Sequence, residues 1–251
     1  VKWIWLCVVG RVACLSARRP YLHVPYGESA PAGVVSISVD GKVPGTSLDL
    51  THWTNNETPE AFYADTSTEI AVNFARAAAE RGEYAAFDGA VVVNNHYDTD
   101  GLLSALVATN PEAALPFAEH LIAGAEAGDF GEWSSDVGVK LDCVCGALAD
   151  GAAADGGAAA ALERLPEIVA DLALTGGAES EALWGPGYEA VLESWEAVVE
   201  NWAMVSEGDG RVAVVHETPA VGRLHPAAIH RALPPAWQRD ECARVLRASF
   251  F

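Results

Sequence analysis

Three potential metal ligands stand at alternate positions shortly after an apolar, β-branched run. The run covers residues 91–93, and the ligands are His96, Asp98 and Asp100. Because alternate residues of an extended segment share a side, one loop can aim these three side chains at a single point. Carboxylate oxygens with one imidazole suit Mn or Mg better than a thiolate site would. We therefore predict a site for a divalent metal, Mn or Mg, on the loop that follows this strand.

The surrounding residues are typical of a loop between a strand and a helix. Gly101 permits a sharp turn of the backbone, and a helical pattern begins at about Leu102. The first turn of such a helix presents unpaired N–H groups, which attract a phosphate or a carboxylate. We predict that His96, Asp98 and Asp100 are catalytic through the metal that they bind. The residues predicted to contact substrate are Asn94, Asn95, Gly101 and Ser104.

A second polar segment is predicted to complete the metal site. Residues 47–51 have the pattern of a short strand that carries Asp49, and His52 follows it directly. A capping box at 66–69 then starts a helix. A strand, a helix and a strand in this order form a right-handed crossover, so the loops of His52 and His96 should lie at the carboxyl ends of neighbouring parallel strands. On this interpretation His52 and Asp49 are further metal ligands.

Other candidates have weaker signals in the sequence. Asp129 lies in a compact turn after a predicted helix, where it is either an outer metal ligand or a surface residue. His52 has an alternative role as an imidazole that packs beside Trp53. His225 precedes a proline and is more typical of a turn than of a metal site.

Known loops of other kinds also place acidic residues at alternate positions before a glycine. An EF-hand loop counted from His96 would put Val107 at the twelfth position, where a bidentate Glu is required. The string Asp98-Thr99-Asp100-Gly101-Leu102 resembles the Asp-x-Asp-Gly-Thr motif of the haloacid-dehalogenase phosphatases, with Leu102 in place of the threonine. A polar loop whose Asp residues only cap the next helix is the structural alternative.

The string His96-Tyr97-Asp98-Thr99-Asp100-Gly101 after a hydrophobic strand resembles the first motif of the DHH phosphoesterases. That superfamily includes single-strand exonucleases, oligonucleotide and cyclic-dinucleotide hydrolases, and inorganic pyrophosphatases. There the equivalent His and Asp side chains bind catalytic metals, so the resemblance implies metal-dependent hydrolysis of a phosphoester or phosphoanhydride. Residues 48–52 with 66–69 look like a degraded form of the Asp-His-His motif, but no such string occurs in the chain. A non-catalytic anion- or nucleotide-binding module with a degenerate site is therefore the alternative.

A second resemblance covers more of the chain. Residues 20–149 are similar to an uncharacterised bacterial family through Thr51-His52-Trp53, through Asp65-Thr66-Ser67-Thr68-Glu69-Ile70, and through residues 94–101 around the predicted metal ligands. This family of unknown function brings no established activity.

Composition limits the class of partner. The chain has 251 residues, of which 51% are hydrophobic, and a net charge of −20. This charge opposes binding to duplex nucleic acid, which depends on a basic surface. A small phosphorylated substrate is compatible with it, because a bound metal would supply positive charge. The five cysteines do not suggest a disulfide framework, and Cys143-Val144-Cys145 has poor spacing for a zinc pair.

The apolar N-terminal segment is too short to span a membrane. Its uninterrupted run is about seven residues, whereas a transmembrane helix needs about twenty. We therefore expect no membrane association and a cytoplasmic location; secretion through residues 1–17 is the alternative.

The pattern of elements predicts an α/β protein with a three-layer, Rossmann-like parallel sheet followed by a mainly helical region. Strands are expected at 34–40, 47–51, 91–93 and 211–217, and one long helix at 186–205, with Trp195 and Trp202 on the same face. The predicted organisation is an N-terminal extension (1–18), an α/β domain with the metal site (19–150), an Ala/Gly-rich connection and helix (151–180), and a helical and mixed C-terminal region (181–251). A truncated tail is one interpretation of the last residues.

Overall fold

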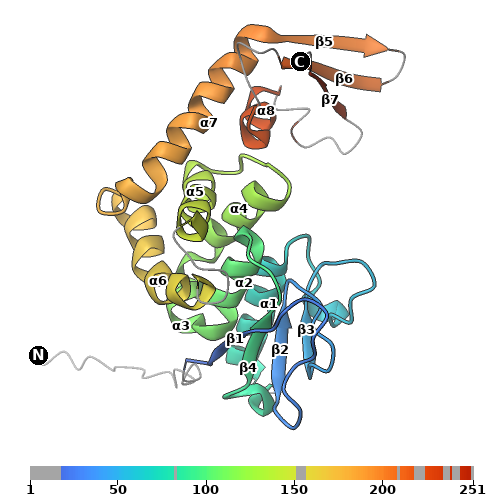
Figure 1. The fold of residues 1–251 in the computed structure, drawn as a ribbon, viewed down its shortest axis with the longest axis vertical. Helices are drawn as coiled ribbons and strands as arrows, with labels where there is room; N and C mark the ends of the chain where they lie inside the picture. The colour runs from blue at the N-terminus through green and yellow to red at the C-terminus, as the bar shows by residue number, and fades with distance from the viewer. Residues whose placement is uncertain are drawn as a thin grey trace, which may run out of the picture.

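The computed structural model describes residues 18–81, 84–150, 157–207, 210–217, 224–233, 238 and 244–249. It contains a parallel sheet with helices packed on it, and a separate three-stranded sheet at the far end of the molecule (Figure 1). Nearly all of the predicted N-terminal extension, and the expected stop of the first helix at Gly82, lie outside the described residues.

Four short strands form the parallel sheet. They are β1 (Tyr21–His23), β2 (Ser36–Val39), β3 (Leu48–Leu50) and β4 (Val91–Asn94), arranged in the order β1-β4-β2-β3. All three pairings are parallel, with Ile37 of β2 opposite both Leu48 and Val92. Ile37 and Val39 of β2 and Val92 and Val93 of β4 are buried, as expected for strands in the middle of a sheet, and Val91 is partly buried. The predicted α/β class with a parallel sheet is confirmed.

Two helices cover one face of this sheet. They are α1 (Ser67–Arg81), which follows β3, and α2 (Thr99–Thr109), which follows β4. The capping box that predicted the start of α1 is confirmed, since the N–H of Glu69 donates to Thr66 Oγ1 at 3.2 Å. Val92 belongs to the core cluster under these helices, whereas Val93 packs on the opposite face with Val24, Ala30 and Val43. Loop residues therefore form the layer on that second face.

A helical region continues the core away from the sheet (Figure 1). Leucines of one of its helices, α6 (Gly157–Thr175), belong to the same buried cluster as Ile37 and Val92. The other helices of this region are α3 (Pro111–Ala114), α4 (Ala118–Asp129), α5 (Asp136–Asp150) and α7 (Glu181–Asn201). Short 3-10 turns lie at Glu60–Phe62 (η1), Ala85–Phe87 (η2) and Leu115–Phe117 (η3).

The C-terminal sheet corrects one prediction. Strands β5 (Trp202–Glu207), β6 (Gly210–Glu217) and β7 (Arg244–Ser249) pair in the order β5-β6-β7, with β5 antiparallel to β6. The helix predicted at 186–205 ends at Asn201, so the expectation that Trp202 shares a helical face with Trp195 is wrong. Pairing with β6, a partner beyond the local window, extends the chain from Trp202 onward. The strand predicted at 211–217 is confirmed as β6.

A short helix, α8 (Pro226–Ala232), returns from the C-terminal region to the helical core. Its Ala227 and Ala228 pack with Val139 of α5 and Val191 of α7. None of the helices among the described residues is long and apolar enough to cross a lipid bilayer.

Candidate metal centre

Three polar side chains converge at the carboxyl ends of strands β2, β3 and β4. Asp40 follows β2 directly, His52 follows β3 after Thr51, and His96 lies on the loop that leaves β4. His52 Nε2 is 3.6 Å from Asp40 Oδ1, and His96 Nε2 is 2.8 Å from Asp40 Oδ2. The carboxyl ends of parallel strands form the usual ligand edge of an α/β sheet.

The strand order corrects the predicted geometry of this edge. The loops of His52 and His96 do meet, with the Trp53 and His96 rings 5.2 Å apart. However, β3 and β4 are not neighbours, because β2 lies between them. The residue that follows β2, Asp40, therefore stands between the two histidines. From the sequence alone, Asp40 is only the last residue of the strand expected at 34–40.

The side chains divide into two groups that share Asp40. One group is Asp40, His52, Asp100 and Asp129, and the other is Asp40, His96 and Asp98. Within each group one ligand atom per residue lies within 4.8 Å of all the others. Two ligands on opposite sides of a Mg ion are about 4.2 Å apart, because each bond is about 2.1 Å. Ligands on adjacent sides are about 3.0 Å apart, so the side chains of each group would have to move closer together to hold one cation.

Both imidazoles are oriented as metal ligands usually are. His52 Nδ1 lies 2.6 Å from the carbonyl oxygen of Asp65, and His96 Nδ1 lies 2.9 Å from Asn95 Oδ1. Each of these oxygens accepts a proton from Nδ1, which assigns the tautomer and leaves Nε2 as the second ring nitrogen. In both residues Nε2 faces the carboxylates, including Asp129 at 3.2 Å from His52. Once it loses the Nε2 proton, each imidazole offers a lone pair to the centre.

The two Asp residues of the loop after β4 are fixed by helix N-termini. Asp98 is the N-cap of α2: its Oδ1 accepts from the N–H of Gly101 at 2.8 Å, and its Oδ2 faces His96 at 3.0 Å. Asp100 is fully buried and reaches across to α1, where its two oxygens accept from the N–H groups of Ser67 and Thr68, both at 2.7 Å. The predicted capping of the next helix is thus confirmed for Asp98, whereas Asp100 accepts hydrogen bonds from the N-terminus of the preceding helix α1.

One oxygen of the shared Asp40 carboxylate depends on the protonation state of His96. Its Oδ1 accepts from Ser67 Oγ at 2.9 Å, whereas its buried Oδ2 faces His96 Nε2 at 2.8 Å, which donates only when the imidazole is protonated. With His96 neutral, Oδ2 has no hydrogen-bond donor. Asp40 also has φ of +55°, a conformation that only a few side chains adopt readily. Buried polar atoms without a partner are rare in folded proteins. A cation between Asp40 and the histidines would satisfy this oxygen.

Glycine at position 101 allows the close packing of the centre. A Cβ atom there would lie 2.5 Å from Asn94 Nδ2, 2.9 Å from Asp98 Oδ1 and 3.1 Å from Asp40 Oδ2. A larger residue at this position would displace the side chains of Asp98 and Asp40. The role predicted for Gly101 as a turn residue therefore includes room for the carboxylates.

Burial and contacts between carboxylates and imidazoles shift the pKa values of the centre. Burial, with the nearby carboxylates of Asp40 and Asp129, raises the pKa of Asp100 to about 7. The hydrogen bond to Asp129 is the main cause that raises the pKa of His52 to about 9. Burial alone would lower the pKa of His96, but its hydrogen bonds to Asp40 and Asp98 outweigh this effect and raise it to about 10. Without another cation, protonated imidazoles balance the carboxylates.

Burial is also the main cause that raises the pKa of Asp40. For Asp98 burial acts in the same direction, but its contacts with His96 prevail and lower its pKa. A divalent cation would favour the ionised form of every carboxylate in the two groups.

The remaining predicted site residues have other surroundings. Asn94 Oδ1 accepts from the N–H of Asn95 at 2.6 Å, so it shapes the loop, and Asn95 orients His96. Ser104 is fully buried and donates to the carbonyl of Gly101 at 3.1 Å within α2. Asp49 does not join either ligand group. It accepts from Thr46 Oγ1 at 2.9 Å and lines a separate cavity of about 520 Å³.

Sequence reasoning missed the importance of Asp40 and ranked Asp129 too low. Asp40 is the last residue of the strand predicted at 34–40 and directly follows the observed β2, a position similar to that of His52 after the strand predicted at 47–51. Asp129 ends α4, far along the chain from the strands, and only the packing of α4 against α2 brings it to His52. A signal for Asp40 was present in the sequence, whereas the position of Asp129 depends on tertiary structure.

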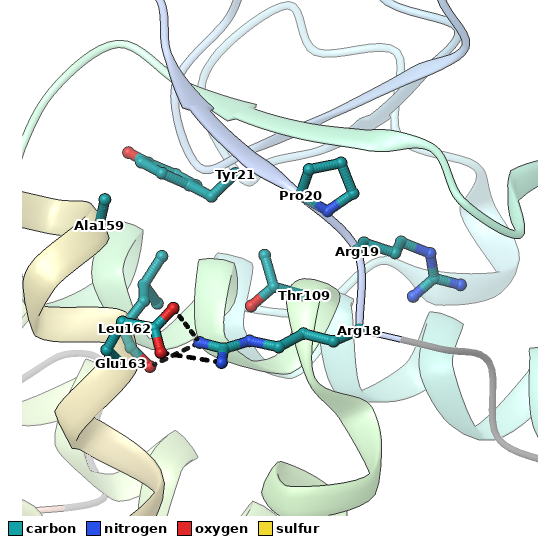
Figure 2. Close-up of a pocket in the computed structure, with 8 residues that line it drawn as sticks. All are labelled: Arg18, Arg19, Pro20, Tyr21, Thr109, Ala159, Leu162 and Glu163. Carbon is teal, nitrogen blue, oxygen red and sulfur yellow. Dashed lines mark hydrogen bonds and ion pairs between the residues drawn. The ribbon is translucent and has the colours of Figure 1, made fainter.

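A second cavity, of about 330 Å³, lies at the start of β1 between α2 and α6 (Figure 2). Its two arginines are already paired with the protein. Arg18 bonds to Glu163 at 3.0 Å, and the buried guanidinium of Arg19 donates to the carbonyls of Phe87 and Ala108. This cavity therefore has little cationic character to offer an anionic ligand, and the metal centre is the better candidate site.

Comparisons with known proteins agree with the broader of the two sequence resemblances. No curated protein and no solved structure matches the chain. The model of a family of unknown function, DUF6687, matches residues 19–236, a range that contains every member of both ligand groups. The chain therefore belongs to DUF6687, a family of unknown function.

Proposed function

We propose that this protein is a hydrolase of small phosphoesters or phosphoanhydrides that uses a pair of divalent cations, Mn or Mg. The observation that carries the proposal is the pair of ligand groups joined by one buried carboxylate, Asp40. Oxygen ligands outnumber nitrogen ligands in both groups, which favours Mn or Mg over softer metals. Paired cations of this kind stabilise both the attacking and the leaving oxygen in phosphoryl transfer.

The donor set fits two cations by its geometry. Asp40 presents one oxygen toward His52 and the other toward His96, as a bridging carboxylate does. Asp100 and Asp129 complete the first group, and Asp98 completes the second. Backbone groups hold His52, Asp98 and Asp100. Side chains hold the others, with Ser67 bonding to Asp40 and Asn95 to His96. These partners orient the side chains before ions bind.

The residues of the chain position the reaction. When bound, the cations would lower the pKa of a water molecule and neutralise charge on the phosphoryl oxygens. Asp40 is the one residue that both ligand groups contain. The hydrogen bonds of the Nδ1 atoms of His52 and His96 keep the Nε2 atoms of both imidazoles facing Asp40. Asp98, 44% exposed, lies at the open side of the centre, where a substrate enters. Hydrolysis adds the hydroxyl of water to phosphorus and its proton to the leaving oxygen.

A non-catalytic anion-binding module receives less support. Such a module would use free N–H groups at a helix N-terminus. Here the N–H groups of Ser67 and Thr68 in α1 are taken by Asp100, and that of Gly101 in α2 is taken by Asp98. An anion at this edge would meet carboxylates, so its binding depends on cations. The haloacid-dehalogenase alternative is also weaker, because Asn95, His96 and Tyr97 separate Asp98 from the end of β4.

Calorimetry and an activity screen test the proposal together. Wild-type protein, stripped with a chelator, should bind two Mn ions per chain and release phosphate from at least one of three classes: phosphomonoesters, dinucleotides and pyrophosphate. His96→Ala should lose binding at one group and lose turnover. His120→Ala is the matched control, because His120 belongs to neither ligand group.

Two results would count against the proposal. If His96→Ala binds Mn as wild type does, the predicted centre is wrong. If wild type binds Mn but cleaves no compound of the three classes, the protein is not the proposed hydrolase. A non-catalytic module that binds anions through cations is then the better interpretation.

A further inference from the structure

We infer that the centre takes a phosphate compound with a planar ring, a nucleoside phosphate, and that Trp53 and Phe130 hold the base. This inference rests on the proposed function and names the substrate class of the same site. Its starting observation is that each of the two ligand histidines contacts an exposed aromatic side chain. The Trp53 and His96 rings are 5.2 Å apart, and the Phe130 and His52 rings are 6.1 Å apart.

These aromatic side chains are open to solvent. Trp53 is 37% exposed and Phe130 is 46% exposed. Single exposed apolar residues are common and need no explanation. Here, however, two of them come from different parts of the chain and meet the two histidines of one centre. The large exposed aromatic residues among the described part of the chain are Tyr26, Trp53, Tyr63 and Phe130.

Hydrogen bonds hold the backbone that carries the Trp53 and Phe130 side chains. The carbonyl of Trp53 accepts from the N–H of Asn56 at 3.2 Å and from its Nδ2 at 2.8 Å. The N–H of Phe130 donates to the carbonyl of Glu126 at 3.1 Å, and Gly131 after it has φ of +65°. A Cβ atom on Gly131 would lie 2.2 Å from Pro226 Cβ, so α8 supports this turn from behind. The rings are therefore presented before any ligand arrives, which reduces the entropy cost of binding.

Charge favours a neutral stacking group beside the phosphate. The chain carries a net charge of −20, so apart from the cations the protein offers an anion little attraction. Stacking on an aromatic ring is independent of charge and of base identity. A nucleoside phosphate combines a phosphate for the cations with a flat, uncharged base within one sugar of it. Inorganic phosphate or pyrophosphate would leave both rings unused.

A pair of probes that differ only in the base tests the inference. Mn-loaded protein is titrated with adenosine 5′-monophosphate and with ribose 5-phosphate, which has the same sugar and phosphate. Wild type should prefer the nucleotide by roughly 5- to 150-fold, the range expected for one stacked base. If the protein cleaves either probe, the ratio of kcat/KM values replaces the ratio of Kd values.

Variants separate stacking from support of the histidines. Trp53→Ala and Phe130→Ala should each reduce the preference for the nucleotide, and Trp53→Phe should restore much of it. Because the readout is a ratio, any weakening of the cations through His96 or His52 affects both probes alike. Leu174→Ala, which removes an exposed apolar side chain of α6, should leave the ratio unchanged.

The possible failures are distinguishable. Equal affinity of wild type for the two probes would overturn the inference and leave the proposed hydrolase intact. A preference that survives Trp53→Ala and Phe130→Ala together would also overturn it, since the base would then bind elsewhere. If neither probe binds because the protein holds no Mn, the proposed function fails and this inference fails with it.

Discussion

Asp40→Asn should separate the stability of the fold from the binding of cations. The change removes one charge from the carboxylate that both ligand groups share. In the absence of metal the variant should be at least as stable as wild type, because burial opposes the ionised form of Asp40 and raises its pKa. The amide retains an oxygen to accept from Ser67, and its nitrogen can donate to His96 Nε2 when that imidazole is neutral, a state that loss of the Asp40 charge favours.

Added Mn should reverse this order of stability. At a concentration of about 100 times Kd, one bound ion stabilises the folded protein by about 2.7 kcal/mol. For a chain of this size that raises Tm by roughly 5–11 °C. Outer partners of metal ligands change affinity by about 10- to 100-fold, and a shared direct ligand should cost at least the upper value. With about 100-fold weaker binding, the same Mn concentration stabilises the variant by only ~0.4 kcal/mol, or about 1–2 °C.

Thermal unfolding with chelator and with Mn measures both effects in one series. Asp49→Asn is the matched control: Asp49 bonds to Thr46, lies outside both ligand groups, and should leave the Mn response of wild type intact. An Asp40→Asn protein that gains as much Tm from Mn as wild type would show that Asp40 is not a ligand. A variant that is less stable than wild type in chelator would show that Asp40 supports the fold instead.

Two further predictions concern the neighbours of Asp40. In the folded protein without metal, the pKa values of His52 and His96 are raised from 6.5 to about 9 and about 10, so the stability that these residues contribute is complete below pH 6.5 and is lost as the pH rises through 9 and 10. Tm in chelator should therefore fall across this window while Mn binding tightens, because each imidazole must lose a proton to bind; a rising Tm would contradict it. Asp98→Ala should lose about 0.5–2 kcal/mol of stability in chelator, as loss of the α2 N-cap predicts, whereas Asp98→Asn should lose much less. Both Asp98 variants should bind Mn more weakly in calorimetry, and equal unfolding free energies in urea would argue against the capping role.

Local signals in the sequence were sufficient for the elements that carry the site. The β-branched run at 91–93 became β4, and the capping box at 66–69 became the start of α1. These features depend on residues within a few positions of one another, so short windows of sequence contain the necessary information. His96, Asp98 and Asp100 were therefore recognisable as candidate ligands without a structure. The structure does not gather them at one point as expected, because Asp100 lies in the first turn of α2 and groups with His52, whereas Asp98 groups with His96.

The order of the strands was not recognisable in this way. Placement of β2 between β3 and β4 depends on contacts between segments far apart in the chain, and this placement brings Asp40 to the middle of the centre. The position of Asp129 similarly depends on how α4 packs. Asp49 was predicted as a metal ligand, but it belongs to neither ligand group. It lies inside β3 and lines a separate cavity. His52, two residues after the end of β3, belongs to the candidate centre.

Asp98 and Asp100 have two structural tasks in addition to the cation binding that we propose. Asp98 caps its own helix, while Asp100, in the first turn of α2, reaches the N-terminus of α1. Each carboxylate therefore lies at the positive end of a helix dipole, which lowers the cost of collecting negative charge before a cation arrives. Because Asp100 is also a predicted ligand, cation binding and the packing of α1 against α2 are coupled through one side chain. Variants of Asp100 should consequently change stability and cation binding together, which makes Asp40 the more discriminating position for testing the centre.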